Sequence, residues 1–505
     1  MPVLIFCVKI KLKQPKKMTK KTKIIATIGP ASDSREKLVQ LVEAGVNVVR
    51  LNFSHGDYVS HGNIIKLIRE LGVEMKRPIG IVADLQGPRI RIAIDNDLEI
   101  EKGEIIRVSD AVAFPNFQFP ISNFQTNSND PISKIIFLDY PDIIGDINIG
   151  NEILIEDGIK RLKVTKKQDE FLEAEVLNGG IIKNHKGVNI PDANFHFGAM
   201  TEKDERDLEF AVGQEVDFVA LSFVSNGKEI EAVREKIKKI LGRDLILPQI
   251  ISKIERKEAM KNIKEIIKAS DVVMVARGDL GIEMEESKVV IYQKELIAKC
   301  LKANKPVIVA TQMLDSMIVN PIPTRAEVSD VSNAVIDHTD AVMLSGESAS
   351  GKYPVEAVKV MRDIIKNVEE SPFDDINPGF LDDDIFTDFA SLINSAHELA
   401  RSSKAKAIIM YTETGLTARL MSHHRPEQLM IAATNNLKTY NQLSIVWGIR
   451  AYLFENGESR ENFIDLIIEK TKNDHKLEKG DKAVVILGRT STGRSMTLIG
   501  IKEVG

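Results

Sequence analysis

The strongest constraint on the fold is a regular alternation of short apolar segments with amphipathic helical patterns. The apolar segments are rich in Ile and Val at successive positions, which is typical of parallel strands buried on both faces. Eight such units are the number in a (β/α)8 TIM barrel, although a doubly wound sheet shows the same alternation. The expected strands lie in KIIATIGP (23–30), VNVVRLNFSHG (46–56), IGIVADLQGP (79–88), DFVALSFV (217–224), LILPQIISKIE (245–255), DVVMVARGDLG (271–281), KPVIVATQML (305–314) and DAVMLSGES (340–348).

Polar side chains gather at the C-terminal ends of these expected strands. In a (β/α)8 barrel these ends converge on one face, where active sites form. A single Lys or Arg after a strand is commonly a solvated loop charge, and a single Thr commonly caps the next helix. Because seven strand ends carry such residues, we expect a site instead. The residues are Arg50, Asn52, Ser54 and His55; Asp84; Ser222; Lys253 and Glu255; Arg277 and Asp279; Thr311 and Gln312; Ser345 and Glu347.

Three stretches depart from the barrel pattern, which we assign to residues 19–87 and 189–370. In residues 88–188 short strand-like pieces alternate with turn signals, which predicts an inserted all-β domain, a β-barrel able to close over the barrel mouth as a lid. Residues 371–384 are polar and turn-rich and are expected to form a linker. Residues 385–505 again alternate helix and strand, which predicts a C-terminal α/β domain.

Composition narrows the class of protein. A chain of 505 residues with 43% hydrophobic and 28% charged residues is typical of a globular protein of several domains. The net charge of -5 predicts no general attraction to nucleic acid or membrane surfaces, and no uninterrupted apolar run is long enough to span a bilayer. Cys7 and Cys300 are the only cysteines, which excludes a disulfide framework and fits the cytoplasm.

The N-terminal residues 1–18 combine a short apolar stretch with many lysines. A signal peptide would place its charge first and carry a longer apolar core. We expect a disordered extension, or a protein that truly starts at Met18, and a targeting or anion-binding arm is the alternative.

The strand ends predict a metal-dependent site for phosphoryl transfer. Glu255 and Asp279 follow neighbouring strands, and two carboxylates with few other ligands suit Mg²⁺ or Mn²⁺. The alternative is that they only pair with Lys253 and Arg277. Transfer of a phosphoryl group depends mainly on positioning and charge neutralisation, and no Walker A loop or protein-kinase motif is present. The expected anion-binding groups are the cations Arg50, Lys253 and Arg277, the backbone at Gly278, and the hydroxyls of Thr311 and Ser345.

The same segments resemble pyruvate kinases. The resemblance rests on KTKIIATIGPAS, VVRLNFSHG, ISKIE, MVARGDLGIE, ATQMLDSM, PTRAEVSDVSNAV and MLSGESASGKYPVEAV, and it runs from about residue 19 to the C-terminus. It implies a barrel with a lid, a C-terminal regulatory domain and a homotetramer. It also implies transfer of the phosphoryl group of phosphoenolpyruvate to ADP, giving pyruvate and ATP, which is the last step of glycolysis.

By matching positions, the resemblance also implies residue roles. Glu255 and Asp279 would bind Mg²⁺ or Mn²⁺, Lys253 would stabilise the phosphoryl group in flight, and Arg50 would bind phosphate. The remaining roles fall into three sets. The backbone amides of Ala276, Arg277, Gly278 and Asp279 would hold the substrate carboxylate together with Thr311, which also lies near the enolate carbon; Thr27, Pro30, Asn52 and His55 would line the nucleotide site; Asp157 would help the lid to close.

A phosphorylated allosteric effector is the expected ligand of the C-terminal domain. TETGLT (412–417) lies between an expected strand and helix, where amides and hydroxyls can hold a phosphate. An ordinary strand–helix turn is the alternative. The candidate effector residues are Thr412, Thr414, Gly415, Thr417, Arg489 and Arg494.

The segment ADLQGPRIR (83–91) bears on the need for K⁺. Many pyruvate kinases carry Glu in the place of Arg89, with Thr and Lys at positions 85 and 86, and hold K⁺ through groups corresponding to Asn52, Ser54, Asp84 and residue 85. A second branch has Leu and Gln before the Gly-Pro break and a Lys after it, and needs no K⁺. Leu85 and Gln86 follow that branch, whereas Arg89 departs from both patterns. We expect Arg89 to replace K⁺, and the alternative is that it pairs with a lid carboxylate.

Two other functions are compatible with parts of this pattern. A metal-dependent barrel aldolase or synthase acting on keto-acid enolates would use the same metal and Arg, but it has no need of a lid together with Lys253. A non-enzymatic protein derived from a kinase would be expected to have lost part of the charged set, which is complete here.

Overall fold

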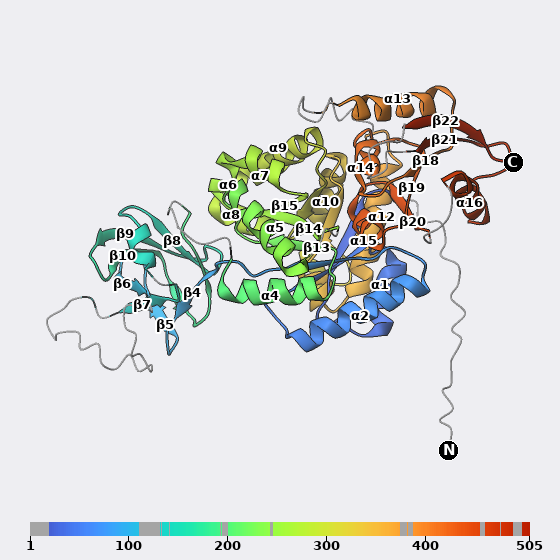
Figure 1. Ribbon diagram of the computed structural model, residues 1–505. Coiled ribbons are helices and arrows are strands. Elements are labelled where there is room, and N and C mark those ends of the chain that lie inside the picture. The colour runs from blue at the N-terminus through green and yellow to red at the C-terminus, as the bar shows by residue number, and fades with distance from the viewer. Residues whose placement is uncertain are drawn as a thin grey trace, which may run out of the picture.

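The structure is a computed structural model in which three bodies follow one another (Figure 1). It describes residues 20–505 except 111–131, 133, 141, 192, 194–199, 243–245, 374–380, 382–386, 455–459, 475 and 488–496. The expected N-terminal extension (1–18) and most of the expected linker lie outside the described residues. Within the part of the chain that is described, no helix is both long and apolar enough to cross a membrane.

The central body is a closed parallel barrel. Among the described residues, eight strands close it in the order β1-β17-β16-β15-β14-β13-β3-β2. This confirms the (β/α)8 fold and excludes a doubly wound sheet. The strands are β1 (Lys23–Thr27), β2 (Val48–Asn52), β3 (Gly80–Asp84), β13 (Phe218–Leu221), β14 (Gln249–Ile254), β15 (Val272–Ala276), β16 (Val307–Ala310) and β17 (Ala341–Leu344).

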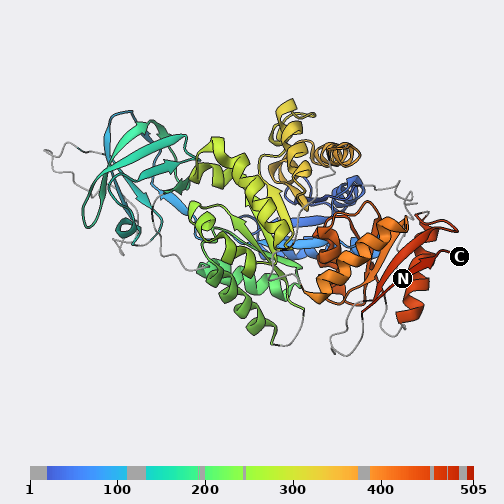
Figure 2. The ribbon, with the colours of Figure 1, turned by 90° about the horizontal axis from the view of Figure 1, so that it is seen from above.

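Helices surround this barrel, as the view from above shows (Figure 2). Several begin at a capping box, in which the N-cap side chain accepts from the backbone N–H of the third helical residue. Thr201 and Asp204 form one such box, and Thr324 and Glu327 form another. The helical elements are α1 (Arg35–Ala44), α2 (Tyr58–Glu74), α4 (Glu202–Gly213), α5 (Gly227–Leu241), α6 (Lys257–Lys261), α7 (Ile263–Ala269), α8 (Arg277–Glu283), η2 (Glu286–Lys288), α9 (Val289–Lys302), η3 (Asp315–Ile318), α10 (Arg325–Ile336), α11 (Gly346–Ala349) and α12 (Pro354–Glu369).

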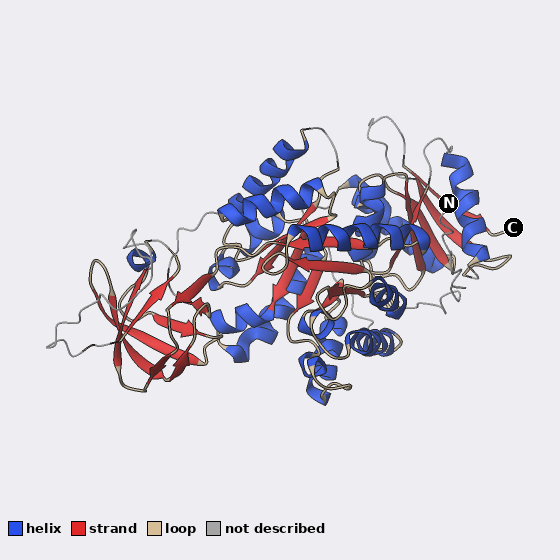
Figure 3. Cartoon of the chain, turned by 90° about the horizontal axis from the view of Figure 1, so that it is seen from below, coloured by secondary structure: helices blue, strands red, loops and turns tan. Residues whose placement is uncertain are grey.

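The inserted body consists almost entirely of strands (Figure 3). It is a second closed barrel in the order β10-β6-β7-β4-β12-β8-β9, with the pair β11-β5 beside it. Its last strand ends at Asn189, one residue beyond the predicted range 88–188. Its elements are β4 (Ile90–Ala93), β5 (Leu98–Ile100), β6 (Ile105–Asp110), β7 (Ile135–Leu138), α3 (Ile143–Asp146), β8 (Glu152–Ile155), β9 (Lys160–Lys167), β10 (Leu172–Asn178), β11 (Gly180–Ile182) and β12 (Gly187–Asn189).

The C-terminal domain is a five-stranded sheet with helices, in the order β20-β19-β18-β21-β22. Its apolar core is continuous with the interior of the central barrel: Leu443, Ile445 and Trp447 belong to the same buried cluster as Ile25 and Phe218. Its elements are α13 (Asp388–Ser402), β18 (Ala407–Tyr411), α14 (Leu416–His423), β19 (Leu429–Thr434), α15 (Leu437–Gln442), η4 (Leu443–Ile445), β20 (Ile449–Leu453), α16 (Arg460–Asn473), β21 (Lys482–Leu487) and β22 (Leu498–Glu503).

Candidate active site

The two-residue period of the barrel strands explains why the polar strand ends converge. Along β14, Ile251 belongs to the apolar interior of the barrel, and Lys253 lies two residues further on the same face. The same step leads from Val48 to Arg50 in β2 and from Val82 to Asp84 in β3. The interior is therefore apolar through most of its length and charged at its C-terminal end.

Asp84 is the centre of the charged cluster. Its carboxylate is buried and pairs with the Arg50 guanidinium at 2.6 Å, and its Oδ1 lies 3.5 Å from the Lys253 ammonium. Arg50 also donates to the Thr27 hydroxyl at 2.9 Å. Burial alone would raise the pKa of Asp84, but the charges of Lys253 and Arg50 outweigh it and hold the pKa below its usual value. Asp84 is therefore an anion that holds two cations at the mouth of the barrel.

The Lys253 ammonium is fixed by three groups. It donates to the Ser222 hydroxyl at 2.8 Å, and it pairs with Glu255 at 2.8 Å as well as lying near Asp84. Burial lowers the pKa of Lys253, but the negative charges of Asp84 and Glu255 together raise it by more than burial lowers it. The net pKa therefore lies above the usual value. Lys253 is thus a permanently charged group with a defined position.

Glu255 and Asp279 form a pair of carboxylates suited to a divalent cation. Glu255 is buried, and its Oε2 accepts from the Phe223 amide at 2.7 Å. The pKa of Glu255 is raised, first by burial and then also by the charge of Asp279, although Lys253 opposes the shift. A cation bound by both carboxylates would relieve this repulsion. Within the described residues no group of three or more acidic, His or Cys side chains could hold a metal, so substrate oxygens and water would complete the coordination.

Arg277 does not add its charge to this face. Its guanidinium is buried and pairs with Asp330 at 2.6 Å, and it donates to the Thr311 carbonyl at 2.9 Å. The sequence expectation also counted Arg277 in the cationic field for the substrate; in this geometry Asp330 neutralises its charge. The backbone of Arg277, at the start of α8, remains next to Gly278.

Thr311 lies beside that helix start. Its hydroxyl accepts from the Gly278 amide at 2.7 Å and donates to the Ala310 carbonyl at 2.6 Å. Thr311 and Gln312 both have positive φ, 68° and 53°, which is uncommon for residues other than glycine and marks a constrained backbone. At the neighbouring strand end, Glu347 is buried and accepts from the amides of Ser345 and Leu314. Glu347 therefore holds loops together, and Ser345 is left partly exposed.

The residues expected near the nucleotide are spread around the rim. Thr27 is buried and donates to the Leu344 carbonyl, whereas Pro30 and His55 are exposed. Asn52 ends β2 and accepts from the Ser54 amide at 3.1 Å. Asp157 is exposed in a turn of the inserted barrel with a φ of 56°. The structure thus places four of these residues at the ends of β1 and β2 and the fifth on the other body.

Arg89 lies on the path from the central barrel to the inserted one. A Cβ built on Gly187 of β12 would meet the Arg89 guanidinium at 3.1 Å, so this side chain packs on the inserted barrel, whereas the partners of Asp84 are Arg50 and Lys253. Leu85 is buried in the apolar core. The two opposite charges of ADLQGPRIR therefore do not pair in this arrangement.

The segment TETGLT forms a turn between β18 and α14. The Thr412 hydroxyl accepts from the Gly415 amide at 2.9 Å, and Gly415 has a φ of 81°, which suits glycine. Thr414 is exposed and Thr417 is buried. The two arginines expected to join this segment, Arg489 and Arg494, lie outside the described residues.

A second polar cluster, at the junction of the two barrels, was not assigned from the sequence. Asn189 of β12 hydrogen-bonds Glu283 at the end of α8, and a hollow there is lined by Arg89, Arg256 and Glu283. Burial raises the pKa of Glu283 to about 7. Because Asp279 lies in the first turn of the helix that Glu283 ends, α8 links the carboxylate pair to the inserted barrel. The strand-end pattern does not mark Glu283, which lies about two helical turns beyond the end of β15.

Comparisons with known proteins agree with this geometry. Residues 19–358 match the family model for the pyruvate kinase barrel domain, and residues 390–498 match the model for the pyruvate kinase alpha/beta domain. The chain belongs to the pyruvate kinase family. It is therefore a phosphotransferase of that family, which transfers the phosphoryl group of phosphoenolpyruvate to ADP.

Individual relatives cover most of the chain. A pyruvate kinase of Bacillus licheniformis is 40% identical over 493 residues, which are 96% of this chain and 81% of the relative. One of Clostridium perfringens is 41% identical over 478 residues, 93% of this chain and 96% of the relative. The crystal structure of a pyruvate kinase from Cryptosporidium parvum is 34% identical with a TM-score of 0.86, and 96% of each chain is covered.

Proposed function

We propose that the C-terminal end of the central barrel is the site of phosphoryl transfer and that Lys253 acts on the transferring group. The observation that carries this proposal is the position of the Lys253 ammonium, 2.8 Å from both Ser222 and Glu255. An ammonium held in place beforehand stabilises the charge of the phosphoryl group without reorganisation during the reaction. Arg50, held by Asp84 and Thr27, binds the phosphate from the other side.

Glu255 and Asp279 are the proposed ligands of Mg²⁺ or Mn²⁺. The bound cation neutralises charge on the phosphoryl and enolate oxygens. The amides of residues 276–279 and the Thr311 hydroxyl hold the substrate carboxylate, and the same hydroxyl lies on the face from which the enolate carbon receives its proton. The Ser345 hydroxyl is a further proposed contact to the anionic substrate. Thr27, Pro30, Asn52 and His55 line the nucleotide side, which Asp157 covers when the inserted barrel closes as a lid.

We also propose that Arg89 supplies the positive charge for which other members of the family use K⁺. Two unit charges about 4 Å apart at an intermediate dielectric interact by about 4 kcal/mol, which is comparable to the contribution of a bound ion. Leu85 removes one hydroxyl ligand from the region that Asn52, Ser54 and Asp84 would otherwise offer to K⁺. Because the guanidinium lies against Gly187 in this structure, the proposal requires it to turn toward Asp84 when the lid closes.

The oligomeric state and the regulation that we propose are those that the resemblance to the family implies. We propose a homotetramer in the cytoplasm and a phosphorylated effector bound by Thr412, Thr414, Gly415 and Thr417, together with Arg489 and Arg494. The support for the effector site is the turn at the start of α14, where the amide of Gly415 and the hydroxyl of Thr412 lie together.

A coupled assay tests the proposed site. Purified protein with Mg²⁺, phosphoenolpyruvate and ADP should form pyruvate and ATP in equal amounts. The Lys253→Gln and Glu255→Gln variants should lose most of this activity, the latter with a raised Mg²⁺ requirement. A Glu255→Gln enzyme with an unchanged Mg²⁺ dependence would remove Glu255 from the ligand set.

A further inference from the structure

A hollow lined by cationic side chains lies at the N-terminal end of the central barrel, the end away from the candidate active site. There the barrel contacts α14 of the C-terminal domain. The empty space of this hollow, including the part open to the solvent, is about 240 Å³. Lys305 contributes to it from the loop before β16, and Arg419 and Arg425 contribute from α14 and the residues after it. Among the described residues that line it, Asp340 is the only carboxylate.

The cations of this hollow are not neutralised equally. Arg425 pairs with Asp340 at 3.1 Å, yet within the described residues its buried Nε has no hydrogen-bond partner. Among the described residues, Lys305 donates only to backbone carbonyls, those of Ser270 at 2.6 Å and Lys268 at 3.4 Å. Arg419 donates to the Thr414 carbonyl at 3.3 Å. The described part of the chain thus provides neither Lys305 nor Arg419 with a carboxylate at ion-pair distance.

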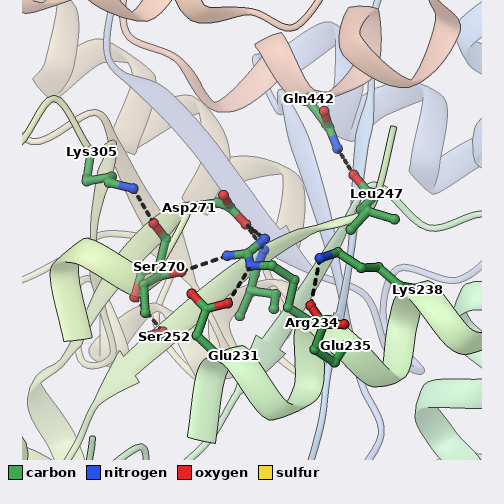
Figure 4. Close-up of polar contacts among 12 residues, drawn as sticks. Glu231, Arg234, Glu235, Lys238, Leu247, Ser252, Ser270, Asp271, Lys305 and Gln442 are labelled. Atoms are coloured by element: carbon green, nitrogen blue, oxygen red, sulfur yellow. Dashed lines mark hydrogen bonds and ion pairs between the residues drawn. The ribbon is translucent and has the colours of Figure 1, made fainter. Parts of the chain in front are cut away.

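Asp271, which is outside the lining but acts electrostatically on Lys305, already has other partners. Figure 4 shows it beside Lys305 but turned toward Arg234, with which it pairs at 2.9 Å. The same oxygen accepts from the Ile250 amide at 2.9 Å. Burial lowers the pKa of Lys305; the charge of Asp271 opposes this shift, and the charges of Arg419 and Arg234 add to it. The net pKa of Lys305 lies below its usual value, mainly because of burial.

We propose that this hollow is a binding site for a phosphate group, either free inorganic phosphate or the phosphate of a small phosphorylated metabolite. Three cations and one carboxylate leave a surplus of two positive charges, which a phosphate dianion would neutralise. Guanidinium and ammonium donors that converge from two bodies suit the several oxygens of one phosphate. The site is separate from the active site and from the proposed effector turn, but Arg419 contacts that turn through Thr414.

The decisive experiment is a calorimetric titration with inorganic phosphate. Saturating phosphoenolpyruvate and Mg²⁺, without ADP, keep phosphate out of the active site. We expect the wild type to bind phosphate and the Lys305→Gln variant to bind it at least tenfold more weakly. Lys302→Gln is the matched control, because Lys302 is an exposed neighbour outside the hollow, and its affinity should equal that of the wild type. Lys305→Arg, which keeps the charge, should restore binding and shows that a loss is not due to misfolding.

Each alternative outcome is distinct. Equal affinity in the wild type and in Lys305→Gln, or no binding by the wild type at millimolar phosphate, overturns the proposal. Phosphate held only by the turn at 412–417 would be weakened by Arg419→Gln and unaffected by Lys305→Gln, which also overturns it. Repeating the titration with a hexose monophosphate separates the two sources: tighter binding than inorganic phosphate indicates a phosphorylated metabolite, and weaker binding indicates free phosphate.

Discussion

The two ends of the central barrel use buried acidic residues in opposite ways. At the N-terminal end, three aspartates each directly precede a strand, pair with an arginine and accept a hydrogen bond from the backbone N–H of a neighbouring strand. Asp217 pairs with Arg69 and accepts from Ile81; Asp271 pairs with Arg234 and accepts from Ile250; Asp340 pairs with Arg425 and accepts from Val307. At the C-terminal end, Asp84 and Glu255 instead hold Lys253 and Arg50 at the open mouth.

We propose that the N-terminal end of the barrel stores stability and that the C-terminal end carries out the chemistry. Charged residues at the N-terminal end satisfy the backbone of the strands and join the barrel to the C-terminal domain, whose Trp447 lies between Lys21 and Arg425. Charged residues at the C-terminal end instead hold one another, with Asp84 paired to Arg50 and close to Lys253. Buried polar atoms without a hydrogen bond occur at both ends among the described residues, Oδ1 of Asp84 at one end and Oδ1 of Asp217 and Nε of Arg425 at the other, so the two ends differ in their partners and not in this respect.

The largest effect is expected for Lys253→Met. Loss of the ammonium should reduce ATP formation by about a thousandfold or more, because the charge acts on the transferring group. Exchange of the pyruvate methyl protons should be reduced less, since enolisation depends on the metal and the Thr311 side. Initial rates of ATP formation and proton exchange by NMR measure the two effects. The matched control is Lys261→Met, at an exposed position of α6, and near-normal ATP formation by Lys253→Met would refute the assignment.

The next largest effect is a many-fold dependence of activity on K⁺, which we expect in a triple variant and not in the wild type. The wild type should retain substantial activity when a bulky tetraalkylammonium is the only monovalent cation, because in our proposal Arg89 provides the charge. The triple variant Leu85→Thr, Gln86→Lys and Arg89→Glu should become dependent on K⁺. Initial rates with and without K⁺ decide the question. If the wild type is nearly inactive until K⁺ is added, the proposal that Arg89 replaces K⁺ is wrong.

At the other end of the barrel, Arg69→Met should change stability rather than catalysis. It leaves Asp217, which is 1% exposed, without its guanidinium partner at 2.9 Å. Breaking a buried pair costs about 3–5 kcal/mol, and because Arg69 is partly exposed we expect about 2–3 kcal/mol here. Denaturant unfolding measures the loss, and kcat of the folded enzyme should be unchanged. If the variant instead lost activity without losing stability, the division of roles between the two ends would be wrong.

The sequence predicts the C-terminal end of the barrel well because the signal is local. Strand period and strand end together place Arg50, Asp84, Lys253 and Glu255 without knowledge of long-range contacts. The partner of Arg277, Asp330, lies on α10, and no local pattern in the sequence reveals that pairing. The insertion of Trp447 beneath the barrel also depends on packing between two bodies. Contacts between bodies, including the Glu283–Asn189 link, are the part that the sequence alone does not provide.

The contact between Glu283 and Asn189 predicts that pH has a moderate effect on the stability of the protein. The folded-state pKa of Glu283 is raised to about 7, mainly by burial, above the value of about 4.5 expected in the unfolded chain. The folded state therefore binds the extra proton between these values, and stability should fall as pH rises from about 5 to 7. Glu283→Gln removes this contribution, so its melting temperature relative to the wild type should increase over that range. Parallel pH dependences for the two proteins would show that Glu283 does not titrate there.

The smallest effect is expected when residues 1–17 are removed. The first described residues are attached to the N-terminal end of the barrel: Glu369 accepts from the amides of Lys21 and Thr22 at 2.7 and 2.6 Å, and the Lys23 ammonium donates to the Ile449 carbonyl at 2.7 Å. The deletion leaves these contacts intact, so melting temperature and kcat should match those of the full chain. Glu369→Gln, which weakens the attachment itself, should lower the melting temperature and is the matched comparison. A deletion that destabilised the enzyme as much as Glu369→Gln would show that the segment contributes to the stabilising end of the barrel.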